Sequence, residues 1–216
     1  MQRYFIIGTD TNCGKTYVTA CLLDYFPQSL AIKPVASGVV EFEGELISSD
    51  AHILHQHCQL DLQKINPWLF KSPVSPHIAA KEQGIEVSAS DIVDYCLQQP
   101  FDTDLLFIEG AGGLEVPLND VETWVDVLKL SQIPVILVVG IKLGCINHAL
   151  LTARSLAVNG IECVGWIANC IDPQMLALHE NIDTLNNKLP FPCLTVISHG
   201  EEIKTLFTLQ GSLCVI

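Results

Sequence analysis

The sequence is poor in basic residues for its length. Its 216 residues include 11 lysines and arginines against 24 aspartates and glutamates, which gives a formal net charge of -13. Proteins that bind nucleic acid without reading its sequence, or that dock on anionic lipid, need a basic surface. We therefore expect neither nucleic acid nor a membrane among its partners. An anionic ligand would have to be held locally, by helix N-termini and single lysines.

The sequence also lacks long hydrophobic runs. Tyr4–Ile7 is too short for the core of a signal peptide, and Ile133–Val139 contains a proline and is far too short to span a bilayer. We therefore expect no targeting segment and no transmembrane helix. Internal repeats and low-complexity linkers are missing as well.

Closely spaced cysteine pairs are missing, although the chain has nine cysteines. They are scattered, with no Cys-x-x-Cys pair, and several stand in apolar runs, where a thiol behaves as a small core residue. We expect reduced cysteines and a cytoplasmic location.

The distribution of apolar residues predicts the fold class. Hydrophobic residues make up 49% of the chain and charged residues 16%, which describes a compact protein and excludes disorder. At this length we expect a single domain over residues 1–216. Runs that are apolar throughout indicate strands buried on both faces. We therefore expect an α/β fold: a doubly wound, mainly parallel β-sheet with helices on both faces.

The predicted elements alternate along the chain. Strands are expected at Tyr4–Gly8, Leu30–Ala36, Leu105–Glu109, Pro134–Gly140, Ile161–Asn169 and Cys193–Ile197. Helices are expected at Gly14–Phe26, Ile146–Val158 and Pro173–Lys188. Val39–Pro76 is less regular, which predicts an insertion that contributes loops to the site. Ligands of such sheets bind beyond the carboxyl ends of the strands, so the residues just after each strand are the informative ones.

The first predicted strand runs into a glycine-rich loop, Gly8–Thr16. A P-loop uses glycines to turn backbone N–H groups onto phosphates, a lysine to reach the β- and γ-phosphates, and a hydroxyl to bind Mg²⁺. Gly14-Lys15-Thr16 supplies the second half of this pattern, although five residues rather than four separate Gly8 from Gly14. The alternative is a glycine-lysine turn that merely ends a strand. The strand before it, the helix after it and later acidic residues favour an ATP-consuming, P-loop NTPase-like enzyme.

Three residues are candidate ligands of Mg²⁺, since this ion prefers hard oxygens. Thr16 is the first, and Glu109 is the second, because a carboxylate at the end of a buried strand is costly unless it meets a cation. Asp50 follows two serines and precedes a helix-like segment. It could ligate the metal or belong to an ordinary helix N-cap, and its spacing alone leaves both interpretations open.

Further sequence blocks follow the glycine loop. They are Lys33–Gly38, Ser49–Ala51, Asn66-Pro67, Ser75–Ile78, Glu109–Gly113, Pro134–Gly140 and Lys142–Ala149. Together with Gly8–Thr16 these blocks resemble the dethiobiotin synthetase family along nearly the whole chain. A glycine loop alone is shared by very many proteins, whereas this combination in this order is specific.

The resemblance implies an ATP-dependent ligase of biotin biosynthesis. In this family one amine of 7,8-diaminononanoate (7,8-diaminopelargonate) captures CO2 as a carbamate. ATP phosphorylates the carbamate to a carbamic-phosphoric anhydride, and the second amine then displaces phosphate and closes a cyclic urea. The products are dethiobiotin, ADP and phosphate. ATP is the co-substrate and Mg²⁺ the implied cofactor.

The resemblance also implies roles for single residues. Catalytic roles fall to Lys33, Lys15 and Thr11, and metal binding falls to Thr16, Asp50 and Glu109. The implied ATP-binding residues are Asn12, Cys13, Gly14, Lys15, Thr16, Tyr17, Asp50, Glu109, Gly110, Ala111, Gly112, Asn169 and Cys170. The implied substrate-binding residues are Ser37, Leu143, Gly144, Cys145 and Asn147.

The resemblance also implies how the substrate tail and the adenine are bound. In the family a helix N-terminus of the neighbouring subunit holds the tail carboxylate of the substrate, and Leu143–Asn147 match that element. The resemblance therefore implies a homodimer with active sites at the interface. Asn169 follows a strand at the place of adenine recognition, where an amide can read the N6/N7 edge.

Several features leave questions open. A dimeric P-loop ATPase switch of the partitioning or site-selection type is the alternative function, although such switches usually carry an additional lysine where this chain has Thr9–Thr11. Cys170 and Ser198–Gly200 depart from the family pattern, which leaves nucleotide selectivity open and predicts that it is weak.

The cluster of His52, His55, His57 and Cys58 could hold a transition metal or form an ordinary solvated helix surface. His77 receives no role.

Overall fold

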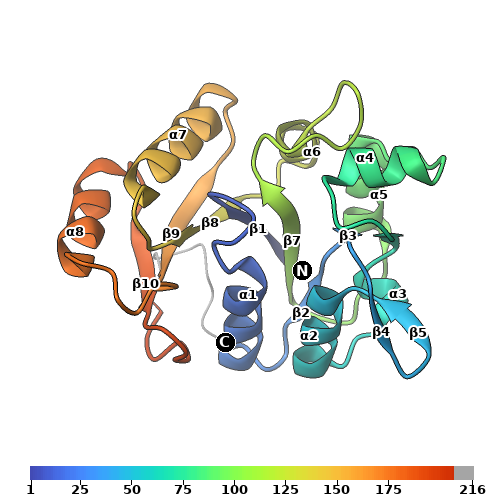
Figure 1. The fold of residues 1–216 in the computed structure, drawn as a ribbon, viewed down its shortest axis with the longest axis horizontal. Helices are drawn as coiled ribbons and strands as arrows, with labels where there is room; N and C mark the ends of the chain where they lie inside the picture. Colours follow the sequence, from blue (N-terminus) through green and yellow to red (C-terminus); the bar gives the residue numbers. More distant parts are fainter. Residues whose placement is uncertain (207–216) are drawn as a thin grey trace.

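A six-stranded β-sheet forms the centre of the structure, a computed structural model that describes residues 1–206 (Figure 1). Its strands are β1 (Gln2–Gly8), β2 (Leu30–Ile32), β7 (Leu105–Gly113), β8 (Val135–Gly140), β9 (Cys163–Asn169) and β10 (Cys193–Ile197). They lie in the order β10-β9-β8-β1-β7-β2, and all five neighbouring pairs are parallel. The predicted parallel sheet of an α/β fold is confirmed.

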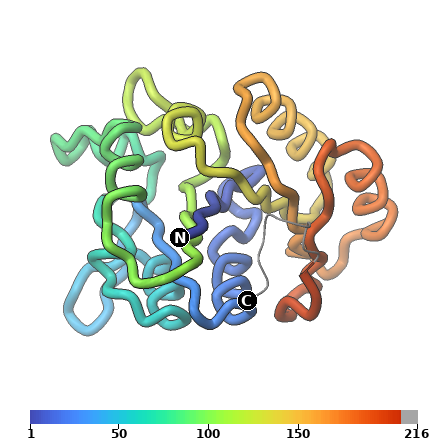
Figure 2. Tube along the Cα trace, turned by 180° about the vertical axis from the view of Figure 1, so that it is seen from behind, coloured from blue at the N-terminus to red at the C-terminus, as the bar shows by residue number. Residues whose placement is uncertain are grey.

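Helices cover both faces of this sheet. They are α1 (Lys15–Tyr25), α2 (Ser49–Cys58), α3 (Leu62–Ile65), α4 (Pro76–Glu82), α5 (Ala89–Gln98), α6 (Trp124–Ser131), α7 (Cys145–Val158) and α8 (Leu178–Lys188). Alternate residues of β1 point to opposite faces: Phe5 packs in the cluster that holds residues of α5 and α6, and Ile6 packs with residues of α1 and α2. Residues of α7 and α8 pack on Leu137 and Val139 of β8. In Figure 2 the blue α1 lies below the sheet and the orange α7 above it, on its opposite faces.

The predicted strand Leu30–Ala36 is wrong as one element, because it breaks at Lys33 and Pro34. β2 ends at Ile32, and β3 (Val35–Ser37) leaves the main sheet to pair with β6 (Trp68–Phe70). Pro34 has no N–H to donate to a strand ladder, which explains the break at this position. Lys33 therefore stands at a corner between two sheets.

Other boundaries also differ from the prediction. The helix predicted over Pro173–Lys188 begins at Leu178, because the preceding Ala177 has a left-handed backbone with φ 54°. β7 continues to Gly113, where Gly8 of β1 pairs with it. Helices α5 and α6 were missed. Each begins with a capping box, Ser88 with Asp91 and Thr123 with Asp126, and this sequence signal would have located both.

Val39–Pro76 is more regular than expected. It holds a hairpin of β4 (Val40–Phe42) and β5 (Glu45–Ile47), followed by α2, α3 and β6. The segment brings the first turn of α2 to the site, because Asp50 in that turn pairs with Lys33. The single-domain organisation over residues 1–216 stays a prediction.

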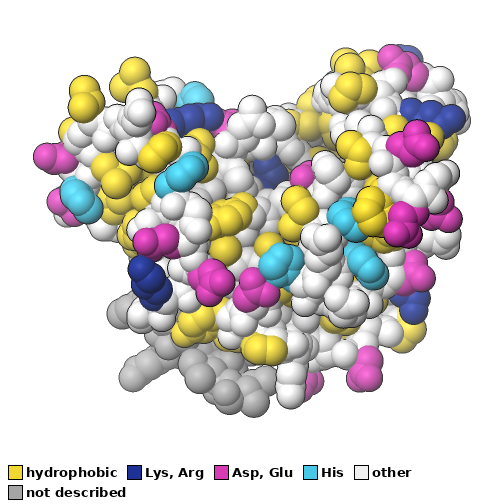
Figure 3. All heavy atoms as spheres, turned by 60° about the horizontal axis from the view of Figure 1, so that its bottom comes forward, with side chains coloured by type: hydrophobic (Ala, Val, Ile, Leu, Met, Phe, Trp, Pro, Cys, Tyr) yellow, Lys and Arg dark blue, Asp and Glu magenta, His cyan; other side chains and the backbone are white. Residues whose placement is uncertain are grey.

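Two further sequence expectations concern cysteines and membranes. The eight cysteines of the described residues are all unpaired, and Cys214 lies outside the described residues. None of the helices in residues 1–206 is long and apolar enough to cross a membrane. Acidic side chains are spread over the face drawn in Figure 3, and basic ones stand in separate small groups.

Candidate active site

The glycine loop runs from the end of β1 into α1. Gly14 precedes the helix with φ 84°, a left-handed backbone that favours glycine. A Cβ at Gly14 would also lie 2.1 Å from Nδ2 of Asn169, so a side chain would collide with the end of β9. The same Nδ2 donates to the carbonyl oxygen of Cys13 at 3.0 Å. The loop is therefore held against the end of β9.

Lys15 projects from the start of α1 across the loop. Its Nζ donates to the carbonyl oxygens of Asp10 at 3.0 Å and Gly112 at 2.7 Å. The residue is buried, yet among residues 1–206 it forms no ion pair with a carboxylate. Two neutral carbonyls thus hold an ammonium whose charge stays available to an anion.

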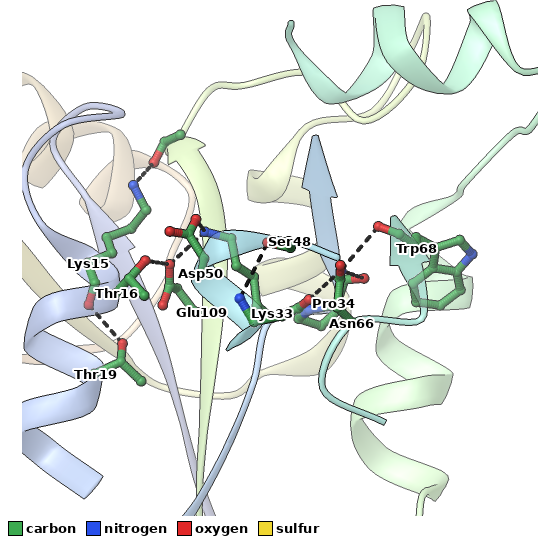
Figure 4. A network of polar contacts seen from close by, with 12 residues as sticks. Lys15, Thr16, Thr19, Lys33, Pro34, Ser48, Asp50, Asn66, Trp68 and Glu109 are labelled. Atoms are coloured by element: carbon green, nitrogen blue, oxygen red, sulfur yellow. Dashed lines mark hydrogen bonds and ion pairs between the residues drawn. The ribbon is translucent and has the colours of Figure 1, made fainter. Parts of the chain in front are cut away.

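Lys33, Asp50 and Glu109 meet just past the end of β2 and beside the middle of β7 (Figure 4). Nζ of Lys33 donates to Oε1 of Glu109 at 2.7 Å and pairs with the carboxylate of Asp50. The same Oε1 accepts a hydrogen bond from Oγ1 of Thr16 at 2.7 Å. Glu109 is 0% exposed and Lys33 5% exposed. The cluster therefore joins the start of α1, the corner after β2, the start of α2 and the interior of β7.

The charges in this cluster stabilise one another. Burial acts to lower the pKa of Lys33, but the carboxylates of Glu109 and Asp50 outweigh it and raise that pKa above its ordinary value. Burial acts to raise the pKa of Asp50, but the Lys33 ammonium and the Thr16 hydroxyl hold that pKa below its usual range. Lys33 therefore stays an ammonium and Asp50 a carboxylate across the neutral pH range.

These side chains line a cavity of about 430 Å³. The lining residues are Thr11, Asn12, Gly14, Lys15, Thr16, Lys33, Ala36, Ser37, Asp50, Glu109, Ala111 and Gly112. All of them except Ala36 are among the site residues predicted from the sequence. Residues from four separate segments of the chain thus converge on one cavity at the carboxyl ends of the strands, where the fold class places ligands.

Three predicted ATP-binding residues point their side chains elsewhere. The hydroxyl of Tyr17 donates to the carbonyl oxygen of Glu201 at 2.6 Å, which turns the ring toward the segment after β10. Cys13 is buried, and its Sγ contacts the carbonyl oxygen of Asp10 at 3.2 Å. Cys170 is buried as well, and burial raises the pKa of its thiol. At the buried Cys13 and Cys170, a contact with a nucleotide would therefore have to come from the backbone.

Two more predicted ATP-binding residues support the cavity from behind. Gly110 lies in β7, where a Cβ would come within 2.9 Å of Cδ1 of Ile7, so a larger residue there would displace the end of the Ile7 side chain. Asn169 is 3% exposed, and its amide nitrogen is bonded to the loop at Cys13. Both residues position the loop and the strand that carry the cavity.

The predicted substrate-binding turn Leu143–Asn147 lies outside this cavity, at the start of α7. Leu143 is 94% exposed, whereas the side chain of Cys145 is buried. The N–H of Cys145 donates to the carbonyl oxygen of Lys142 at 3.0 Å. A helix leaves its first N–H groups without intrahelical acceptors. The donors that this turn can offer outward therefore include backbone groups of the first turn of α7, such as that of Asn147.

An ion pair that sequence reasoning missed joins the glycine loop to this turn. Oδ2 of Asp10 lies 2.6 Å from Nζ of Lys142. The other oxygen of Asp10, Oδ1, is buried without a hydrogen-bond partner among residues 1–206. Both residues stand in sequence blocks that were recognised, but neither received a role. The pair therefore ties the glycine loop to the start of α7.

Comparison with known proteins identifies the family. The model of a family described as an AAA domain matches residues 2–205. An ATP-dependent dethiobiotin synthetase of Legionella pneumophila (strain Paris) is 55% identical over 207 residues, which cover 95% of this chain and 98% of the relative. The chain belongs to the ATP-dependent dethiobiotin synthetase family. The synthetase of Pseudoalteromonas translucida (strain TAC 125) is 40% identical and covers 95% of this chain and 94% of its own length.

Solved structures resemble the dethiobiotin synthetase fold of this chain at low sequence identity. A ParA family ATPase from Chlorobium tepidum TLS superposes with a TM-score of 0.57 at 13% identity, covering 93% of this chain and 85% of that chain. The septum site-determining protein MinD of Pyrococcus horikoshii superposes with a TM-score of 0.55 at 15% identity, covering 91% and 81%. At these identities the likeness concerns the fold alone. It confirms the predicted P-loop NTPase-like architecture and does not favour the alternative function.

The oxygens of Thr16, Asp50 and Glu109 suit a magnesium ion in this synthetase cavity. All three are hard donors, and they come from three segments that meet at this cavity. Oε2 of Glu109 is buried and has no hydrogen-bond partner among residues 1–206, so a carboxylate oxygen is free for a cation. The donor set therefore fits the implied cofactor.

The histidine cluster on α2 does not converge. Nδ1 of His55 contacts the carbonyl oxygen of Leu60 at 2.8 Å, and Nδ1 of His57 contacts Asp24 at 2.7 Å. His52 contacts Gln56 instead. No group of three or more His, Cys, Asp or Glu within residues 1–206 is arranged to hold a metal ion.

His77 lies in the first turn of α4. Its Nδ1 lies 3.0 Å from Oγ of Ser75, the residue that precedes the helix. The contact ties the ring to the start of the helix, outside the residues that line the cavity.

Proposed function

We propose that this chain is an ATP-dependent dethiobiotin synthetase, which joins 7,8-diaminononanoate and CO2 and closes the cyclic urea at the expense of ATP. The single observation that carries the proposal is the second buried cation, Lys33, in the cavity of a P-loop. One lysine, Lys15, is enough to hold the phosphates of ATP. A further ammonium, on the side of Asp50 and Glu109, gives a place for a second anion beside the γ-phosphate.

The chemistry balances with the diamine as the source of both nitrogens. One amine attacks CO2, loses a proton and becomes a carbamate. A carbamate oxygen attacks the γ-phosphorus of ATP, and ADP leaves. The second amine then attacks the carbamate carbon, the carbon–oxygen bond breaks, and inorganic phosphate departs with that oxygen. Dethiobiotin, ADP and phosphate are the products.

The residues of the cavity divide this work. Backbone N–H groups of the glycine loop and the Lys15 ammonium bind the β- and γ-phosphates. Lys33 binds the carbamate and the transferring phosphoryl group, and Thr11 donates to the oxygens of either. Because both reactants are anions, the barrier depends largely on charge neutralisation and on alignment. Ser37, half-buried at the end of β3, hydrogen-bonds the amine or carbamate end of the substrate.

Thr16, Asp50 and Glu109 would hold Mg²⁺ in the working enzyme. When bound, Mg²⁺ supplies charge neutralisation at the β- and γ-phosphates. Asp50 is suited to this role because its pKa is held low, which keeps it ionised. Its carboxylate can pair with Lys33 and still present an oxygen to the cavity.

The tail carboxylate of the diamine binds at the start of α7 of a neighbouring subunit, which makes the enzyme a homodimer. The exposed Leu143 and the first-turn N–H groups of α7 support this assignment. The Asp10–Lys142 pair would then connect the phosphate end of one site to the substrate turn. The cytoplasmic location and the exclusion of nucleic acid stay predictions.

The test is an omission experiment with purified protein. ADP release is followed with ATP and Mg²⁺ alone, then with diamine, with bicarbonate, and with both. A dethiobiotin synthetase releases ADP only with the complete mixture and forms a cyclic urea detectable by mass spectrometry. ADP release that ignores the diamine would instead favour a switch of the partitioning type.

A further inference from the structure

The corner between β2 and β3 carries Lys33 on a backbone that neither sheet holds completely. The N–H of Lys33 donates to the carbonyl oxygen of Ile65 at 2.9 Å, in α3 rather than in the main sheet. Pro34 has no N–H, and its carbonyl oxygen accepts from the N–H of Trp68 at 3.0 Å. A lysine on such a corner needs another contact to fix the direction of its side chain.

The side-chain amide of Asn66 supplies this contact (Figure 4). Its Nδ2 donates to the carbonyl oxygens of Lys33 at 2.9 Å, Pro34 at 3.2 Å and Trp68 at 3.2 Å. Asn66 is 8% exposed. Two N–H groups shared among three carbonyls tie both residues of the corner to β6. A buried amide used in this way has no remaining donor for a ligand.

The Asn66 amide contacts the backbone of Lys33 and not its ammonium. Lys33 is held on its N–H side by Ile65 and on its carbonyl side by Asn66, so the Cα between them is fixed. From that point the side chain reaches Glu109 at 2.7 Å. Misplacing a catalytic group by about 1 Å can cost about 10²-fold in rate. The direction of Lys33 is therefore sensitive to the corner on which it stands.

We propose that Asn66 is a positioning residue of the reaction, which aims the Lys33 ammonium at the transferring phosphoryl group by clamping the corner between β2 and β3. The proposal rests on the proposed function of Lys33. Asn66 itself touches neither substrate nor nucleotide, because it lies outside the residues that line the cavity. Asparagine suits the place because its amide has two donors, whereas a carboxylate of the same shape has none.

The first measurement separates turnover from binding. Asn66→Ala removes the amide, and Asn66→Asp keeps its shape but removes the donors. In each variant kcat should fall by about 10- to 100-fold, while KM for ATP stays close to the wild-type value, because the glycine loop does not touch Asn66. An unchanged kcat in a folded variant would overturn the proposal. If neither variant folds, Asn66 serves the fold and the proposal fails.

The second measurement is a double-mutant cycle with Lys33→Ala. If Asn66 acts through Lys33, the double variant Asn66→Ala/Lys33→Ala is no slower than Lys33→Ala alone. If the two residues act independently, their separate losses multiply, and that result would contradict the proposal. Dethiobiotin formation and ATP turnover are both recorded. If the wild-type protein turns over ATP without making dethiobiotin, the proposed function is refuted. The double-mutant cycle measured on ATP turnover would then still show whether Asn66 acts through Lys33.

Asn119→Ala is the matched control for lost stability. Asn119 also fastens loop backbone with a side-chain amide, because its Nδ2 donates to the carbonyl oxygen of Val87 at 3.0 Å and its Oδ1 accepts from the N–H of Val121 at 3.0 Å. It lies away from the cavity of Lys33. We expect it to lower the melting temperature without lowering kcat. An equal loss of kcat in Asn119→Ala would show that general destabilisation explains the Asn66 result.

Discussion

Replacing Lys33 by methionine separates the two jobs that we assign to this ammonium. In the structure it neutralises Glu109 and Asp50, and in the proposed reaction it binds the carbamate and the γ-phosphate. Methionine is nearly as long and apolar, so it fills the space without bringing a charge. The variant leaves Glu109, which is fully buried, without its cation.

The expected loss of stability follows from the burial of the partners. Removing one member of a buried ion pair costs about 3–5 kcal/mol. Lys33→Met should cost about 3 kcal/mol, the lower end of that range, because Thr16 still donates to Glu109 and the Asp50 side chain is 39% exposed. At about 2–4 °C per kcal/mol for a chain of this size, the melting temperature falls by about 6–12 °C. Turnover should fall by about 10²- to 10³-fold.

A compensating substitution tests the reasoning. Adding Glu109→Gln removes the buried charge, so the double variant should regain much of the lost stability while staying inactive. Thermal unfolding is measured with a chelator present, because a divalent cation held by Glu109 and Asp50 would replace the missing ammonium. Lys81→Met serves as the control, because Lys81 pairs with Asp120 at 3.6 Å on the exposed surface. This substitution should change neither the melting temperature nor the turnover.

Two results would refute this account of Lys33. Near-normal turnover of Lys33→Met would remove Lys33 from the reaction. A double variant no more stable than Lys33→Met would show that the buried charge of Glu109 is not what the lysine offsets.

The remaining predictions concern pH and nucleotide choice. Because the pKa of Asp50 is held below its usual value, its charge contributes stability that is present above the unfolded pKa of about 3.9 and is lost as the pH falls through the lower folded value. Asp50→Asn should therefore flatten the fall in the free energy of unfolding below about pH 4, measured by urea unfolding; slopes equal to wild type would contradict this. ATP, CTP and GTP should support similar turnover, because Ser198–Gly200 are exposed and the amide nitrogen of Asn169 is bonded to the glycine loop. A strict preference for ATP would show that the departures at Cys170 and Ser198–Gly200 are without consequence.

The parts of the fold that follow hydrophobic patterning were predictable. β8 and β9 are continuous apolar runs, and such runs indicate buried parallel strands. The corner at Lys33 was not predicted, because a short apolar run on either side of Pro34 looks like one strand. Only the partner strand β6, far along the chain, makes the two halves belong to different sheets.

The candidate site divides in the same way. Thr16, Asp50 and Glu109 were predicted as ligands of one magnesium ion, which requires their oxygens to lie close together, and the structure places them together. Spacing alone could not decide between a metal ligand and an N-cap for Asp50. The N-cap of α2 is Ser48, two residues before Asp50, and its Oγ accepts from the N–H of Ala51. The direction of the Tyr17 side chain could not be foreseen, because it depends on a contact with Glu201, near the far end of the sequence.

The sequence could not predict residues that act by positioning other residues. Asn66 stood in a recognised block, but its three carbonyl acceptors come together only in the folded corner. The Asp10–Lys142 pair likewise joins residues that the folded chain alone brings together.

The transfer of oxygen from CO2 to phosphate distinguishes the activation of a carbamate from simple hydrolysis of ATP. If ATP phosphorylates a carbamate, the carbamate oxygen that attacks the γ-phosphorus leaves with inorganic phosphate when the ring closes. With ¹⁸O-labelled CO2, short incubations should therefore yield one labelled oxygen in the phosphate for each dethiobiotin formed, as read by mass spectrometry. Phosphate that takes its new oxygen from water instead would mean that the chain hydrolyses ATP without activating a carbamate, which would refute the proposed reaction.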